Sequence, residues 1–380
     1  MRKPLCLLIV LALLTLLCAC GQTAAPPEPT PSPVPTLEPT PEPTPEPTSV
    51  VLTDESAEEI LALAELESLQ TIDAAASREY DALLALQQLL PACRIEWRYE
   101  LNGESYSSLC RELTLSSTEG LAEGLRYLPS VERVDLLGCE VPDEEKDALL
   151  ELYPGVDFLW TVRFARWTVR SDLVAFSTLQ NSESPRLSDE DFAPLFKYCR
   201  HLRALDLGHN ALRDLRLLGT LRELQVLILA DNPYIEDLSP LAGLSELRYL
   251  ELFNCKSIKD FSCFRSLTKM EDLNICFQHA LTDVSVFENM DKLKVCWFRF
   301  TGLSKEDQAA FAEAHPDANI LFSGNFDHSS ATGGGWRATD ENVVVRTVFK
   351  NWRHVRSFNY YDEVTFDENE VIYWANPSYI

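Results

Sequence analysis

The stretch that decides the fold runs over residues 202–232 and reads LRALDLGHNALRDLRLLGTLRELQVLILADN. It holds the pattern L-x-x-L-x-L-x-x-N twice, starting at Leu202 and again at Leu224. The pattern starts three more times, at spacings of 22 or 23 residues. The later copies are Leu247-x-x-Leu250-x-Leu252-x-x-Cys255, Met270-x-x-Leu273-x-Ile275 and Leu293-x-x-Cys296-x-Phe298. A fixed period of this length indicates stacked structural repeats.

A second pattern runs through the same region in step with the first. Aspartates stand 23 residues apart at Asp214, Asp237, Asp260 and Asp283, and the last three begin an Asp-x-Ser step. Asp and Ser side chains accept hydrogen bonds from backbone N–H groups, so this step predicts a turn or the start of a short helix. A calcium array is the alternative, but the D-x-D-x-D-G spacing of a calcium loop is absent.

These patterns resemble the leucine-rich repeat, and the aspartate-containing half resembles the repeats of internalin-type bacterial surface proteins. The resemblance implies an α/β fold, a leucine-rich repeat solenoid with a parallel sheet on its concave face. In each unit the L-x-L core is a short strand whose leucines point inward. The Asn or Cys at the ninth position is expected to satisfy backbone groups at the strand ends. The internalin resemblance implies adhesion or contact with a host.

The N-terminal half carries a looser version of the repeat. One-unit matches start at Leu69, Cys110 and Val131, and residues 161–190 cannot be assigned a register. A longer block beginning at Asp81 recurs at Asp147 and Asp307, and each copy predicts a helix, a proline stop and a buried strand. We therefore expect degenerate long repeats over 50–200, regular repeats over 201–322, and an α+β cap over 323–380 that covers the open end of the solenoid.

The N-terminus predicts a bacterial lipoprotein signal peptide over residues 1–19. Its apolar run, Leu5 to Ala19, would span roughly 22 Å as a helix, less than the bilayer core of about 30 Å. The run ends in Leu17-Cys18-Ala19-Cys20, which resembles a lipobox and implies acylation of Cys20, with palmitate among the acyl chains. The chain would then be anchored at the extracellular face of the bacterial cell membrane. An ordinary cleaved signal and lipidation at Cys18 are the alternatives.

Residues 20–49 predict an extended stalk after the lipidated cysteine. Residues 26–47 hold 11 of the 22 prolines of the chain. At about 3.1 Å per residue, such a proline-rich segment reaches roughly 70 Å. A proline-rich motif for a partner protein and O-glycosylation of the threonines are alternative roles.

Composition argues against two classes of function. With 33 Lys and Arg against 59 Asp and Glu, the formal charge of −26 disfavours nucleic acid as a partner. The sequence contains no G-x-S-x-G, phosphate-binding loop, H-x-x-x-H or C-x-x-C, so we expect no catalysis, no cofactor and no metal. An envelope enzyme or enzyme accessory subunit, active around Trp336–Arg356, is the alternative. A zinc site built from distant ligands also stays open.

The eight cysteines after Cys20 are expected to be thiols, with one or two disulfides as the alternative.

The concave face is the predicted ligand site. Several residues expected on it are large and apolar, where a solvated sheet face should be polar, so they predict an exposed contact patch. The predicted partner is a protein or a glycan. Two alternatives are that the C-terminal segment folds back over this patch and that the register is off by one. The predicted binding residues are Val226, Ile228, Tyr249, Glu251, Phe253, Asn274, Trp297 and Arg299.

One basic stretch stands out against the acidic chain. Arg346, Lys350 and Arg353 fall at helical spacing, with Trp352 among them. Such a helix could contact an anionic wall polymer or lipid headgroups. It could equally cap the solenoid with its charged face in solvent or against acidic repeats.

Overall fold

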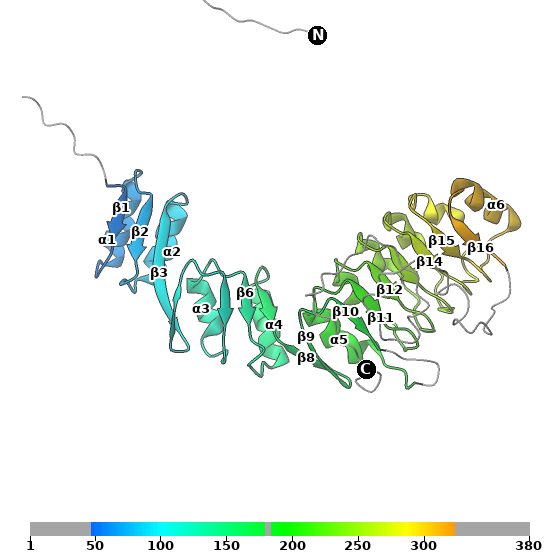
Figure 1. Ribbon diagram of the computed structural model, residues 1–380, viewed down its shortest axis with the longest axis horizontal. Helices are drawn as coiled ribbons and strands as arrows, with labels where there is room; N and C mark the ends of the chain where they lie inside the picture. Colours follow the sequence, from blue (N-terminus) through cyan, green and yellow to red (C-terminus); the bar gives the residue numbers. More distant parts are fainter. Residues whose placement is uncertain (1–46, 179–183, 324–380) are drawn as a thin grey trace, which may run out of the picture. The chain divides into compact units, whose positions relative to one another are not determined.

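A computed structural model describes residues 47–178 and 184–323 of the chain (Figure 1). The predicted signal peptide, the lipidation site Cys20 and nearly all of the stalk lie outside the described residues. The same holds for the predicted C-terminal cap beyond residue 323. Among the described residues, no helix is long and apolar enough to cross a membrane.

The first described sheet contains four strands and has its own core. Strands β1, β2 and β3 are parallel, and β4 folds back on β3 as a hairpin. Helix α1 starts at a capping box, in which Ser56 and Glu59 each bond the backbone of the other. The bounds are β1 (Ser49–Val51), α1 (Ala57–Ala62), η1 (Leu63–Glu65), β2 (Thr71–Ala74), α2 (Tyr80–Leu89), β3 (Arg94–Leu101) and β4 (Glu104–Ser107).

The next part repeats this construction with a shorter sheet. Strands β5, β6 and β7 are parallel, and β8 and β9 form a hairpin where no register could be assigned from the sequence. In both parts a serine hydroxyl accepts a hydrogen bond from the backbone N–H of a tryptophan at 3.1 Å, Ser108 for Trp97 and Ser171 for Trp160. The bounds are β5 (Glu112–Thr114), α3 (Leu121–Tyr127), β6 (Arg133–Asp135), α4 (Asp143–Leu152), β7 (Asp157–Leu159), β8 (Thr161–Phe164) and β9 (Trp167–Arg170).

A seven-stranded parallel sheet follows, with its strands in sequence order. Short 3-10 helices return the chain between most of its strands, as the Asp-x-Ser steps predict. The strands are β10 (Ala175–Ser177), β11 (Ala204–Asp206), β12 (Val226–Ile228), β13 (Tyr249–Glu251), β14 (Asp272–Asn274), β15 (Val295–Trp297) and β16 (Asn319–Leu321). The helices are α5 (Asp189–Tyr198), η2 (Leu218–Thr220), η3 (Ser239–Gly243), η4 (Ser262–Ser266), η5 (Val284–Phe287) and α6 (Lys305–Ala314).

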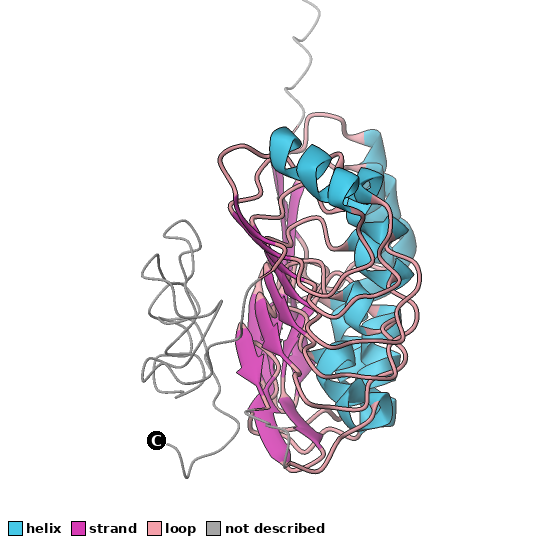
Figure 2. Cartoon of the chain, turned by 90° about the vertical axis from the view of Figure 1, so that its right-hand side faces the viewer, coloured by secondary structure: helices cyan, strands magenta, loops and turns pink. Residues whose placement is uncertain are grey.

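The core of the seven-stranded sheet lies between its strands and these helices. Figure 2 shows the described strands on one side of the chain and the helices on the other. The middle residue of each strand points into this core, and Leu205, Leu227, Leu250 and Leu273 are fully buried there. This arrangement confirms the predicted fold class, a leucine-rich repeat solenoid with mixed α/β content. It also confirms the predicted strand in every repeat.

Side chains at the ninth repeat position form the expected ladder. Asn232 donates to the carbonyl oxygens of Leu207 and Leu229 at 2.9 Å and accepts from the N–H of Leu212 at 3.1 Å. In the next repeat, the Cys255 thiol donates to the Leu229 carbonyl oxygen at 3.0 Å. The aspartates of the second pattern cap turns as predicted, since Asp237 accepts from the N–H of Ser239 at 2.8 Å.

All eight cysteines of the described ranges are free thiols, as expected from the sequence. Six of them are buried. Burial raises the pKa of Cys255 to about 12, so this thiol is protonated and packs as a small apolar group.

Candidate functional site

The face of the seven-stranded sheet opposite the leucine core carries the predicted binding residues, and we call their surface the concave strip. Tyr249 lies beside Val226 on the neighbouring strand. Glu251, Asn274 and Trp297 are consecutive partners in a row across β13, β14 and β15. These side chains alternate with the core leucines along each strand. The predicted register is therefore confirmed, and the off-by-one alternative is excluded.

The concave strip is buried, so the expectation of an exposed patch is wrong. Tyr249 and Glu251 are 1% exposed and Trp297 is 7% exposed. Val226, Ile228, Asn274 and Arg299 are also buried, and Phe253 is half-buried. Burying a large apolar side chain stabilises a protein by about 1.5–3 kcal/mol. Covering a sheet face that carries several such side chains therefore stabilises the protein, and leaving that face in water forgoes this free energy. Whether the strip binds a partner stays a prediction.

The concave strip also contains carboxylates that the sequence analysis did not single out. Asp206 and Asp272 are each 5% exposed. Burial, together with Glu251 and Glu271 nearby, raises the pKa of Asp272 well above its usual value. Its Oδ1 atom has no hydrogen-bond partner among the described residues. The sequence did contain a signal for Asp272. It is an aspartate at a strand position where the adjoining repeats carry tyrosine and valine.

Glu271, which precedes the strip on β14, is a buried carboxylate with nearby cations. It bonds Arg248 at 2.5 Å and Lys294 at 2.8 Å. Burial opposes its ionisation, but these two side chains outweigh it and lower the pKa of Glu271. The contrast with Asp272 shows that a carboxylate on this sheet stays charged where the sheet itself supplies a cation.

An aromatic ladder lies at the end of the strip. Phe253 contacts Phe277 edge-on, with ring centroids 5.3 Å apart, and Phe277 stacks on Phe300 at 4.7 Å. The backbones of Phe277 and Phe300 are left-handed, with φ of 68° and 58°. His209, Asp231 and Asn254 hold the same conformation at the equivalent place in the preceding repeats, so it is a turn of the repeat and not a mark of a binding site. Phe300 is 50% exposed and offers a ring face to a partner.

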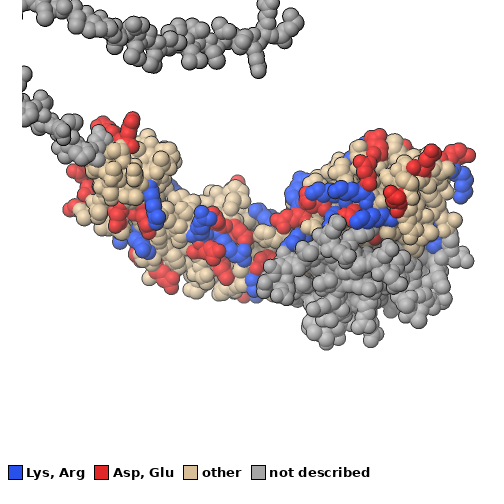
Figure 3. Space-filling view, turned by 45° about the horizontal axis from the view of Figure 1, so that its top comes forward, with Lys and Arg blue, Asp and Glu red and all other residues tan. Residues whose placement is uncertain are grey.

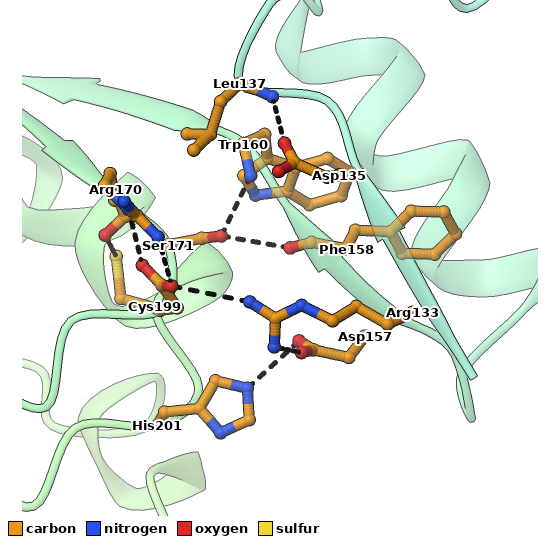
Figure 4. Close-up of polar contacts among 11 residues, drawn as sticks. Arg133, Asp135, Leu137, Asp157, Phe158, Trp160, Arg170, Ser171, Cys199 and His201 are labelled. Carbon is orange, nitrogen blue, oxygen red and sulfur yellow. Dashed lines mark hydrogen bonds and ion pairs between the residues drawn. The ribbon is translucent and has the colours of Figure 1, made fainter. Parts of the chain in front are cut away.

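A second cluster of polar side chains lies next to β7 (Figure 4), and two of its members, Asp157 and His201, line a cavity of about 170 Å³. Asp157 bonds Arg133 at 2.7 Å and the His201 ring at 3.0 Å. Arg133 reaches on to Asp172 at 3.4 Å. Trp160, Tyr198 and Arg200 also line the cavity. These ion pairs join β6 and β7 to the start of the regular repeats, which gives the cluster a structural role.

We expect the Asp157–His201 pair to stabilise the fold in a limited pH range. The bond to Asp157 raises the pKa of His201 above its unfolded value, so its contribution is complete below about pH 6.5 and is lost as the pH rises through the folded pKa. The bond to His201 lowers the pKa of Asp157, whose contribution is present above about pH 4 and is lost as the pH falls through the folded pKa.

His201→Gln should therefore destabilise the protein most between about pH 4 and pH 6.5. The loss should be below about 1 kcal/mol, because both side chains are about a third exposed and solvent screens the pair. Urea unfolding of both chains at pH 5.5 and pH 9 measures it. A loss of the same size at the two pH values would contradict an ionic origin.

The described ranges contain no group of three or more His, Cys, Asp or Glu side chains that could hold a metal ion. They do contain the paired strands, the asparagine ladder and the leucine core of a leucine-rich repeat, and these define the class of fold.

Comparisons with known proteins gave one family match and several similar solved structures. Residues 200–243 match the family model described as leucine-rich repeats in two copies. A search of curated proteins found no match. Among solved structures, internalin C2 of Listeria monocytogenes is 21% identical, covers 53% of this chain and 74% of its own, and has a TM-score of 0.31. An internalin of the same organism, inlF, is 20% identical over 70% of this chain and 71% of its own, with a TM-score of 0.32.

A leucine-rich repeat protein of Leptospira interrogans is also similar, at 13% identity over 71% of this chain and 81% of its own, with a TM-score of 0.30. The fold assignment rests on the strand pairing and the core described above.

Proposed function

We propose that this chain is a non-catalytic binding protein that is tethered to the extracellular face of the bacterial membrane through Cys20. In this proposal it recognises a protein or glycan through the concave strip and the aromatic ladder beside it. The observation that carries the proposal is the row of Glu251, Asn274 and Trp297, which lies in register on neighbouring strands outside the leucine core. A repeat needs only its leucines to stack, so large aromatic and charged residues in this row point to recognition.

The chemistry of this surface suits a partner with both apolar and polar groups. Phe300 supplies exposed aromatic area, and Arg299 lies over its ring at 5.4 Å. Figure 3 shows acidic and basic side chains interspersed over most of the described surface in that view, with several basic side chains side by side on its right-hand part. The net charge of −26 disfavours a polyanion. A folded protein or a neutral glycan therefore fits better than nucleic acid.

A capture experiment tests the proposal through Phe300. Immobilised residues 50–380 are exposed to envelope extracts, host surface proteins and a glycan array, and a captured partner is then purified and titrated. Phe300→Ser should weaken its binding at least tenfold, about 1.4 kcal/mol, because an aromatic contact is lost. Thermal unfolding should be unchanged, since Phe300 is half exposed.

Tyr234→Ser is the matched control, because Tyr234 is 43% exposed and lies away from the strip, beside Arg213. Binding that is equally strong to the wild type and to Phe300→Ser would place recognition elsewhere. In cells, Cys20→Ala should release the chain from the membrane while leaving capture by the purified protein intact. Release from the membrane without loss of capture would mean that anchoring and recognition depend on different parts of the chain.

A further inference from the structure

The cavity beside β7 lies where the second long repeat differs from the first. The two repeats are copies of each other at an offset of 63 residues, at which Trp97 corresponds to Trp160 (160 − 97 = 63). In the first copy the indole Nε1 of Trp97 donates to the Tyr127 carbonyl oxygen at 2.9 Å. In the second copy Trp160 lines the cavity, and its buried Nε1 has no hydrogen-bond partner among the described residues. The second copy therefore lacks a hydrogen bond that the first one makes.

A second hydrogen bond of the first copy is missing at the same place. In the first copy the Gln87 Nε2 donates at 3.0 Å to the carbonyl oxygen of Cys93, the residue before β3. At the same offset Gln87 corresponds to Leu150 and Cys93 to Val156. Leu150 lines the cavity, and its side chain cannot donate a hydrogen bond. The Val156 carbonyl oxygen accepts no hydrogen bond from the part of the chain that the structure describes.

In the regular repeats the next strand bonds the carbonyl oxygen at this position. Val174 is the residue before β10, and its carbonyl oxygen accepts from the N–H groups of Arg203 and Ala204 at 2.7 and 3.1 Å. The residues before β11 to β14 are bonded in the same way. Strand β7, in contrast, is the last strand of its sheet and pairs with β6 alone. No described strand supplies these donors to Val156.

Strand β7 also turns the N–H of Phe158 to this open edge. Asp157 and Leu159 bond the backbone on the β6 side. Neighbouring residues of a strand direct their backbone groups to opposite edges, so Phe158 faces away from β6. The Ser171 hydroxyl donates to the Phe158 carbonyl oxygen at 3.0 Å (Figure 4). The Phe158 N–H itself has no hydrogen-bond partner within residues 47–178 and 184–323.

One residue of an extended peptide matches these two backbone groups. The N–H and C=O of such a residue point to the same neighbouring strand, so its N–H can donate to Val156 while its C=O accepts from Phe158. An N-acetyl group cannot make both bonds, because the N–H and C=O of a trans amide point in opposite directions. The cavity of about 170 Å³ is large enough for one small residue, since benzene fits one of roughly 150 Å³.

The lining of the cavity favours a carboxylate on this peptide. Arg200 lines the cavity, is exposed, and makes no ion pair with the described residues. Asp157 also lines the cavity, but it is already bonded to Arg133 and His201. A guanidinium binds a carboxylate through two parallel hydrogen bonds. Arg200 is therefore the cation of this site that a ligand can use.

We propose that the cavity beside β7 binds one residue of an extended, carboxylate-bearing peptide, which adds to the open edge of β7. The peptide residue donates to Val156 and accepts from Phe158, and the carboxylate pairs with Arg200. The site shares no residue with the concave strip, so this proposal does not depend on the proposed function.

The amide signal of Phe158 in NMR spectra reports this binding directly. The full chain is labelled with isotopic phenylalanine, and the signal is assigned from its loss in Phe158→Leu. Titration with the peptide acetyl-Ala-Asp-Ala-amide should give a saturable shift, because the Phe158 N–H gains an acceptor. The peptide acetyl-Ala-Asn-Ala-amide should bind at least threefold more weakly. No saturable shift with the aspartate peptide, or an equal one with N-acetylglucosamine or acetate alone, would overturn the proposal.

Leu150→Gln restores the side chain of the first copy, which should donate to Val156 and close the cavity. The affinity for the aspartate peptide should fall at least tenfold, while thermal unfolding shows that the fold is kept. Gln87→Leu is the matched control, because it makes the reverse change in the first copy and should leave this affinity unchanged. Binding by Leu150→Gln as tight as that of the wild type would contradict the assigned site.

Arg200→Gln decides the question if Leu150→Gln does not fold, since Arg200 is exposed and its replacement spares the core. This variant should bind the aspartate and asparagine peptides equally, because the carboxylate has lost its partner. A preference for the aspartate peptide that persists in Arg200→Gln would place the peptide elsewhere on the chain.

Discussion

Leu250→Ala is expected to lower the free energy of unfolding by about 2–5 kcal/mol, the range for removing a buried leucine from a close-packed core. Leu250 is fully buried in the middle of β13 and is paired with Leu227 on one side and Leu273 on the other. The cavity would open at the centre of the stack, where neither flanking strand can close it without losing its register. Urea unfolding with an unchanged slope measures the loss.

Leu217→Ala is the matched control for this prediction, because Leu217 belongs to the same regular repeats but is 43% exposed. Its loss should stay within about 0.5 kcal/mol. Equal losses at the two positions would mean that the leucine row is not the source of stability.

Asn232→Leu should cost at least about 3 kcal/mol, although it adds an apolar side chain of similar size to a buried position. Asn232 is fully buried and bonds three backbone groups, those of Leu207, Leu212 and Leu229. Each buried group left without a partner costs roughly 1–3 kcal/mol. Thermal and urea unfolding measure the loss.

Asn289→Leu provides the comparison, since Asn289 is exposed and makes one bond, to the Arg265 carbonyl oxygen at 3.1 Å. Water can replace that bond, so the loss should be small. A neutral result at Asn232 would show that the side-chain ladder does not hold the repeats together.

The repeat architecture could be predicted from the sequence because the same spacing of buried leucines recurs in each unit. Leu205, Leu227 and Leu250 hold equivalent positions, so five copies of the pattern fix both the strands and their register. The hairpin of β8 and β9 could not be placed, because its two strands pair with each other and lie outside the seven-stranded sheet. The 23-residue period of that sheet therefore does not extend to them.

The state of the concave strip could not be predicted for a different reason. The pattern fixes which way Tyr249 and Trp297 point, but burial depends on what packs above them, and that information is not periodic. The same large side chains suit an open contact surface and a covered one. The strand position marks Asp272 as unusual beside the tyrosine and valine of the adjoining repeats, but it does not reveal that Asp272 is buried, because an aspartate on a sheet face is ordinarily solvated.

Each strand in the seven-stranded sheet pairs with only its immediate neighbours. This arrangement affects how such a chain can change over evolution. Its stability is close to a sum of unit and neighbour terms, so a whole unit can be gained or lost without rebuilding the others. Duplication or deletion of a whole unit of 22 or 23 residues keeps the downstream leucines in the stack, whereas a shift of one residue within a strand turns its leucine out of the core. We expect natural variants to differ in copy number, lengthening or shortening the array one turn at a time.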